Sequence, residues 1–239
     1  MGVSSLKAMH DVLCRDRHAA TTPMAATVNT DSLHIKLIEF EEDRKRMRSQ
    51  FNARADRTDH KRNVLIPKYK PLAETYLAAG EKHENPIFST LIVWLFDIGD
   101  LSTAIDWCLK AIELELPTPE FIRRDWPTFC ADSVLKWAET QAEHGHSVEP
   151  YFSRVFAKIR DDWRLHEEVN AKWYKFAGYF LLRDDEGKPR PSAIADKATL
   201  EQAKAFLQQA NEYHSKIGVG TMISKIDMRL SALETGKNL

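Results

Sequence analysis

Apolar residues recur through most of this sequence at spacings of three and four, which place side chains on one face of an α-helix. The stretch Leu101–Glu115 shows the pattern most clearly, with apolar residues at Ala104, Ile105, Trp107, Cys108, Ala111, Ile112 and Leu114. No sustained alternation of apolar and polar residues predicts a β-strand, and the 239 residues include only 9 glycines. These features predict an all-α fold.

Turn residues divide the middle of the chain into two helices. One helix is predicted over Ile87–Ile98, a tight turn at Gly99 and Asp100, and a second helix over Leu101–Glu115, which Pro117 stops. The small residues where these antiparallel helices must come close are Gly99, Ala104 and Ala111. The segment resembles one tetratricopeptide-like hairpin, although the full repeat is incomplete.

A second hairpin is predicted nearer the C-terminus. Its helices are Val169–Arg183, with Gly178 at a close-packing position, and Leu200–Tyr213. The remaining predicted helices are Phe129–Glu143, Glu149–Asp162 and Thr221–Leu233. Short loops between sequential helices favour an array of α-hairpins with tetratricopeptide-like packing, which forms a core domain over residues 81–239.

The N-terminal third is predicted to contain a flexible arm, residues 1–30, followed by a long helical region, residues 31–80. Asp31 or Ser32 is a suitable N-cap for the long helix. Its heptad-like stripe contains Leu33, Leu37, Phe40, Met47 and Phe51, with Arg44 at the remaining position. Such a stripe suits either docking on the chain's own domain or packing between subunits, and both alternatives stay open. The helical pattern continues toward Arg62, after which Pro67 and Pro71 are expected to bend the chain into a helix that ends at Gly80.

The chain has a formal net charge of −1, but its charges are unevenly distributed. Between Arg44 and Lys70, ten Lys and Arg residues stand against two acids, Asp56 and Asp59. A basic segment on an acidic body predicts that one region contacts a polyanion while another contacts proteins.

Eight residues of this basic segment are predicted to bind DNA: Arg44, Lys45, Arg46, Arg48, Arg54, Arg57, Lys61 and Arg62. On one continuous helix they would extend over about 27 Å. Such an array would make salt-dependent contacts with a duplex backbone. Because acids from Glu39 to Asp43 precede the segment, an ordinary solvated helix face is the alternative interpretation.

Motifs for catalysis are weak. There is no G-x-x-x-x-G-K-[ST] phosphate loop, and Gly218-Val219-Gly220 is interpreted as a helix-breaking turn, so ATP hydrolysis by this chain is not expected. Asp184, Glu186 and Lys188 form an E-x-K pattern and are weak nuclease candidates. Because they are predicted to lie in a loop between helices, a solvated acidic loop is the preferred interpretation.

Metal and cofactor motifs are weak as well. His144 and His146 lack further ligands at a suitable spacing, so neither a metal site nor a cofactor is expected. The segment Arg123–Pro127 joins two helices and is interpreted either as a partner contact or as a loop held by stacking of arginine on Trp126.

Cysteine usage and apolar runs indicate the compartment. Cys14, Cys108 and Cys130 are odd in number and form no C-x-x-C pair, which is typical of a reducing cytoplasm, and Cys108 and Cys130 are predicted to be core residues. The longest apolar run, Ile87–Phe96, is far shorter than the roughly 20 residues of a membrane span. No apolar leader is evident. We therefore expect a protein of the cytoplasm that has no membrane partner.

Three segments together resemble the small terminase subunit of temperate tailed bacteriophages of the peduovirus type. The first is Leu91–Asp100, with its W-x-x-D-x-G-D motif, followed by Ala104 and Ala111. The second is Pro119 with Arg123-Arg124, Pro127 and Phe129, and the third is Gly178–Asp184. The resemblance covers about residues 65–235, whereas the N-terminal third is similar only in character.

The resemblance implies a DNA-packaging protein that binds the cohesive-end site of double-stranded viral DNA. It also implies a homo-oligomeric ring that recruits the large ATPase–nuclease subunit and assists DNA cleavage within that complex. Some relatives carry a basic C-terminal tail, whereas this sequence ends at Thr235–Leu239. The DNA contact is therefore expected in the segment from Arg44 to Arg62.

Two other functions stay open from the residues. One is a tetratricopeptide-like adaptor that binds peptides and no DNA. The other is a metal-dependent endonuclease that cuts the cohesive-end site itself, with Glu186 in its centre. Steep salt dependence of DNA binding would favour the terminase over the adaptor.

Overall fold

The structure is a computed structural model, and it describes residues 30–80, 82–184 and 186–236. The described residues contain α-helices, one short 3₁₀-helix and one π-helical turn, and no β-strand occurs among them apart from an isolated bridge between Arg183 and Pro189. The all-α prediction is therefore confirmed. The chain divides into two units, one that ends at Gln50 and one that begins at Phe51. The predicted arm over residues 1–30, with Cys14, lies outside the described residues except for Thr30.

In the first unit, the described residues form helix α2 (Thr30–Gln50). The helix begins one or two residues before the predicted N-cap, a difference of the size expected at any helix end. The sequence predicts that this helix continues into the basic segment Arg54–Arg62, and that prediction is wrong. Helix α2 ends at Gln50 and the next helix begins at Arg54, because Ala53 adopts an extended backbone with φ −73° and ψ 143°.

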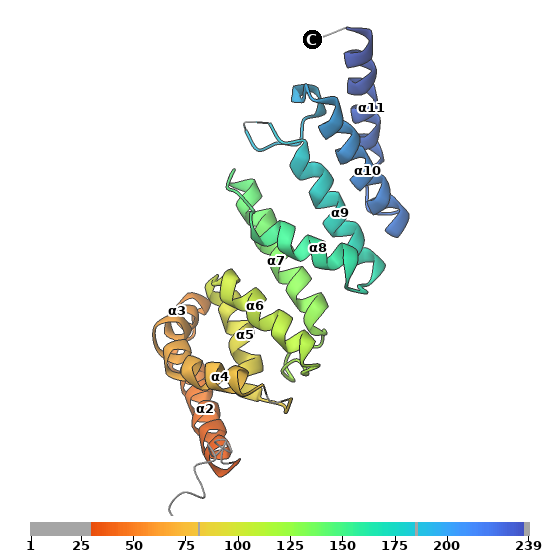
Figure 1. The fold of residues 1–239 in the computed structure, drawn as a ribbon. Coiled ribbons are helices and arrows are strands. Elements are labelled where there is room, and N and C mark those ends of the chain that lie inside the picture. The colour runs from red at the N-terminus through yellow and green to blue at the C-terminus, as the bar shows by residue number, and fades with distance from the viewer. Residues whose placement is uncertain (1–29, 81, 185, 237–239) are drawn as a thin grey trace, which may run out of the picture. The chain divides into compact units, whose positions relative to one another are not determined.

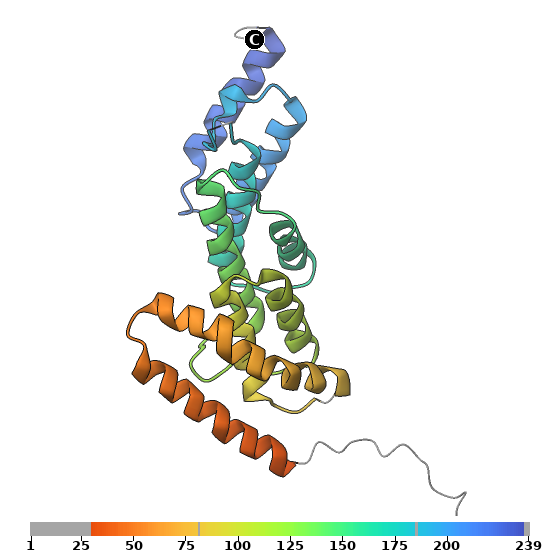
Figure 2. The ribbon, with the colours of Figure 1, turned by 90° about the vertical axis from the view of Figure 1, so that its left-hand side faces the viewer.

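The second unit begins with one long helical segment. Helix α3 (Arg54–His60), the π-helical turn η1 (Lys61–Leu65) and helix α4 (Ile66–Ala79) follow one another without a loop, and Figure 2 shows them, coloured from orange to yellow, as one uninterrupted helical segment. The two prolines do not interrupt the helical segment, and a bend at them stays a prediction. Pro67 is the second residue of α4 and follows the π-helical turn directly, and Pro71 is accommodated inside the helix. Gly80 ends α4 with a left-handed φ of 65°.

The predicted central hairpin is confirmed by α5 (Pro86–Ile98) and α6 (Leu101–Glu113). The side chain of Asn85 caps α5 by accepting the backbone N–H groups of Ile87 and Phe88, each at 3.1 Å. Gly99 forms the turn with φ 81°, a left-handed backbone conformation that glycine adopts without steric cost. Asp100 then caps α6.

The rest of the unit contains α7 (Trp126–Glu143), α8 (Tyr151–Asp161), α9 (Glu167–Leu181), η2 (Pro191–Ala193), α10 (Lys197–Tyr213) and α11 (Gly220–Thr235). Consecutive helices from α4 to α8 and from α9 to α11 pack on one another, and α9 packs on α7 (Figure 1). The predicted array of hairpins is thus present, whereas tetratricopeptide geometry stays a prediction. No described helix is long and apolar enough to cross a membrane.

Aromatic stacking fills the core between α8 and α9. The rings of Phe152 and Trp173 stack with centroids 5.0 Å apart, and Phe156 stacks on the same Trp173. Cys108 and Cys130 are fully buried between α6 and α7, as predicted. A side-chain hydrogen bond with Cys130, together with burial, raises the pKa of the Cys108 thiol.

The segment Arg123–Pro127 is a capped helix start. The Asp125 side chain accepts the backbone N–H of Thr128 at 3.0 Å, and Trp126 is buried in the first turn of α7. Arg124 pairs with Asp132 in the second turn of α7. Arg123 is exposed, and none of the cation–π contacts among the described residues involves this segment. The interpretation of arginine stacking on Trp126 is therefore wrong, because capping holds the loop.

Candidate nucleic-acid interface

Four of the eight predicted DNA-binding residues lie in the last two turns of α2. Arg44 pairs with Glu41 and its guanidinium lies 5.7 Å from the centroid of the Phe40 ring. Arg46 lies 3.5 Å from Asp43. The other two, Lys45 and Arg48, form no ion pair with any described residue and, three positions apart, share one side of the helix.

Two more of the predicted residues lie in α3. Arg57 is used locally, because its Nη1 donates to the carbonyl groups of Phe51 at 3.1 Å and Asn52 at 2.9 Å and so holds the chain before the helix. Arg54 is different: its side chain is 81% exposed, and its nearest acid, Asp97, is 3.9 Å away. Arg54 therefore offers its charge to solvent, whereas Arg57 offers little.

The last two predicted residues lie in the π-helical turn and contact the end of α5. Lys61 donates to Asp97 at 2.6 Å and has a side chain only 15% exposed. Arg62 donates to the Ile98 carbonyl at 3.0 Å and pairs with Asp59. Cations at the C-terminal end of a helix complement its dipole and its free carbonyl groups. Lys61 and Arg62 therefore attach the turn to α5, and Lys61 in particular presents little charge outward.

The weak nuclease candidates form a tight turn between α9 and η2. The Asp184 carboxylate accepts the backbone N–H groups of Glu186 at 3.1 Å and Lys188 at 2.9 Å. The bond from Lys188 is the main cause of the lowered pKa of Asp184, and Arg190 also favours its charged form. Glu186 pairs with Lys188 at 3.1 Å. Both carboxylates therefore have hydrogen-bond or ion-pair partners within the turn.

The histidine pair lies at the end of α7. The Nδ1 atom of His144 is 2.7 Å from the Thr140 carbonyl, and the ring of His146 stacks on that of His144. No group of three or more metal-ligating side chains occurs in the described part of the chain.

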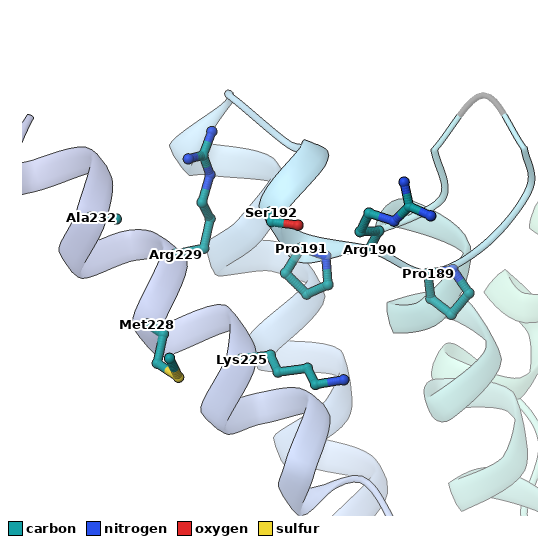
Figure 3. A pocket seen from close by; sticks show the side chains of 8 residues that line it. All are labelled: Pro189, Arg190, Pro191, Ser192, Lys225, Met228, Arg229 and Ala232. Carbon is teal, nitrogen blue, oxygen red and sulfur yellow. The ribbon is translucent and has the colours of Figure 1, made fainter. Parts of the chain in front are cut away.

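A cationic groove that the sequence reasoning missed lies between the loop before η2 and helix α11. It has a volume of 360 Å³ and is lined by Pro189, Arg190, Pro191, Ser192, Lys225, Met228, Arg229 and Ala232. Figure 3 shows its three cations around the two prolines, with Met228 pointing away from them. Met228 is 73% exposed. No local pattern signals the groove, because its two sides are more than thirty residues apart in sequence.

A family model described as the phage small terminase subunit matches residues 37–168, more than half of the chain. The chain belongs to this family. All eight predicted DNA-binding residues of this small terminase subunit lie inside the matched region. The Asp184–Lys188 turn and the cationic groove lie outside it.

Curated relatives agree with the family. The chain is 40% identical over 183 residues to the "Probable terminase, endonuclease subunit" of Haemophilus phage HP1, which covers 77% of this chain and 65% of that protein. It is 25% identical over 170 residues to the "Terminase, endonuclease subunit" of Escherichia phage P2, which covers 71% of this chain and 64% of that protein. The chain thus spans less than two thirds of the length of either relative. No solved structure matches it significantly.

Proposed function

We propose that this small terminase subunit binds double-stranded phage DNA at the cohesive-end site and starts genome packaging as a homo-oligomeric ring. The observation that carries the proposal is the set of cations on the last turns of α2, where Lys45 and Arg48 have no acidic partner among the described residues. Unpaired cations on one helix face release counterions from a duplex backbone when they bind it. Arg54 adds an exposed charge at the start of α3.

Phosphate contacts position a protein on DNA but do not select a sequence. Site selection therefore has to come from assembly, from other residues or from the shape of the DNA. A ring multiplies weak contacts through effective concentration, so a modest cation set in each subunit is sufficient for stable binding.

The cationic groove beside α11 supports recruitment of the large ATPase–nuclease subunit. Its prolines supply apolar contact, Met228 is exposed beside them, and Lys225 supplies charge, whereas Arg190 is shared with Asp184 at 3.2 Å. An acidic segment with a neighbouring apolar side chain fits this combination better than a DNA backbone does, because phosphates make no use of apolar walls. The variant Lys225→Glu/Met228→Asp is expected to weaken large-subunit binding without changing affinity for DNA.

Both relatives carry the word endonuclease in their names. For this chain, we infer that it assists DNA cleavage by the large subunit and does not cut DNA itself. The acids of the Asp184–Lys188 turn bind neighbouring N–H groups and cations, which leaves them poorly placed for catalysis. Magnesium-dependent cutting of a cohesive-end fragment by the purified chain, abolished by Glu186→Ala, would contradict this assignment.

Native mass by light scattering, with and without a cohesive-end duplex, tests the proposal. The expected mass is several times the 27.5 kDa of one chain, and the duplex should bind to that assembly. A strict monomer at micromolar concentration that binds no duplex would overturn it. A monomer that binds acidic peptides instead would favour the adaptor.

A further inference from the structure

A second groove lies in the unit Phe51–Leu239, between α5 and α7 (both labelled in Figure 1). It has a volume of 440 Å³, a size typical of pockets for small ligands. Arg54 of α3 and Lys136 of α7 are among the residues that line it. The groove is too small for a duplex and large enough for a nucleotide or two.

Three half-buried aromatic rings line the groove: Phe96, Phe129 and Trp137. Each ring is held at its edge by another aromatic residue. Phe96 and Phe129 meet edge to face with centroids 5.5 Å apart, and Trp137 meets Tyr151 in the same way at 5.4 Å. Rings already fixed by packing lose little conformational entropy when a ligand covers them.

The charge of the groove is positive. Lys136 is exposed and forms no ion pair with any described residue, and the side chain of Arg54 is 81% exposed. The only acid in the lining, Asp97, is held by Lys61 at 2.6 Å. The groove therefore offers two available cations beside aromatic surface.

We propose that this groove binds one or two unpaired nucleotides of a single DNA strand. The aromatic side chains would contact the bases, and Arg54 and Lys136 would contact the flanking phosphates. Aromatic surface beside cations is the combination by which proteins hold single strands without reading their sequence. In a duplex the bases are paired and stacked, so only an unpaired segment fits. The inference rests on the proposed DNA function and specifies a second DNA state that the subunit recognises.

Fluorescence anisotropy of the full chain tests the proposal with a labelled twelve-nucleotide oligothymidylate and a duplex of equal phosphate number. Lys136→Glu is expected to weaken binding of the single strand by about tenfold and to leave duplex affinity within about twofold, because phosphate contacts dominate affinity. Lys216→Glu, which reverses another exposed lysine outside the groove, is the matched control and should change neither. Equal losses in Lys136→Glu and Lys216→Glu would overturn the groove assignment.

Two further measurements concern the aromatic rings. Trp137→Leu keeps apolar volume beside α8 but removes the ring, and it should weaken the single strand at least fivefold, the lower end of base–aromatic stacking. Because this variant can also disturb packing, an oligonucleotide with 5-iodouracil is cross-linked to the wild type. Cross-links are expected in the peptides that contain Phe96, Phe129 or Trp137, and cross-links confined to other segments would overturn the proposal.

A twelve-residue oligoglutamate distinguishes nucleic acid from an acidic protein segment. If it displaces the single strand at equal concentration, the groove takes acidic peptides and the proposal fails. The proposal of duplex binding by α2 and the proposal of single-strand binding by the groove are tested by different variants. Loss of duplex binding in the α2 variants tests the proposed function, whereas the response of the single strand to Lys136→Glu tests the groove.

Discussion

A Cβ atom added at Gly178 in α9 would lie 2.6 Å from Cδ2 of Leu207 in α10. It would also lie 3.0 Å from the backbone carbonyl oxygen of Ala203, which cannot move aside as a side chain can. The close approach of α9 and α10 therefore depends on glycine. This hairpin carries the loop of the cationic groove and supports α11.

Gly178→Ala is expected to destabilise the protein by about 1–3 kcal/mol, the usual result of overpacking a filled core. Urea unfolding followed by circular dichroism measures the change. Gly220→Ala is the matched control, because Gly220 is helical and has open space around its Cβ position, so its stability should stay equal or rise slightly. Equal stability of Gly178→Ala and the wild type would show that the two helices can separate at little cost.

Lys61 and Arg54 both lie near Asp97 but are expected to differ in role. Lys61→Ala should lower the free energy of unfolding by about 1 kcal/mol, the upper end for a surface ion pair, because its side chain is largely buried against α5. Arg54→Ala should change stability by less than about 0.5 kcal/mol. DNA titration should show the reverse order, with the larger effect for Arg54. A fully stable Lys61→Ala variant that loses DNA affinity would contradict this division.

Glu139 in α7 is expected to make the free energy of unfolding depend on pH. Burial raises its pKa, the nearby Glu143 adds to the rise, and Lys172 and Lys175 of α9 oppose it. A carboxyl group whose pKa is raised by folding stabilises the fold below its unfolded pKa, and that contribution is lost as the pH rises through the folded pKa. Glu139→Gln should therefore be more stable than the wild type at pH 7 and equal to it at pH 4.

The expected gain at pH 7 is under about 1 kcal/mol, because the site lies near the surface and water screens its charges. Thermal unfolding at a series of pH values measures it. Glu212→Gln, which removes an exposed carboxylate on α10, is the control for loss of one negative charge and should differ little from the wild type in stability at pH 7. A Glu139→Gln variant less stable than the wild type at pH 7 would show that the lysines dominate.

Helix periodicity was sufficient to predict the hairpins of this fold. The helices α5 and α6 follow from apolar spacing and from Gly99, which local sequence encodes. The continuity of α3 through Pro67 was not predictable, because the π-helical turn before it is stabilised by contacts of Lys61 and Arg62 with a helix more than thirty residues away. Tertiary contacts of this kind leave no periodic signal.

The same limit applies to the candidate sites. The basic segment was visible as a run of charge, but charge alone did not separate Lys45, which has no acidic partner among the described residues, from Lys61, which is paired with Asp97. The two grooves bring together residues that are distant in sequence. Arg54 and Lys136, for example, are 82 positions apart and line one groove. Only the packing of helices shows such combinations.

The salt dependence of duplex binding by Lys45→Glu/Arg46→Glu/Arg48→Glu tests the central claim most directly. If these residues contact three phosphates, the slope of log affinity against log salt should become less steep by about 2.7, at about 0.9 per contact. Lys82→Glu/Arg123→Glu/Lys216→Glu, which reverses three exposed cations elsewhere, is the control and should keep the wild-type slope. An unchanged slope and affinity in the α2 variant would contradict the assignment of DNA binding to this helix.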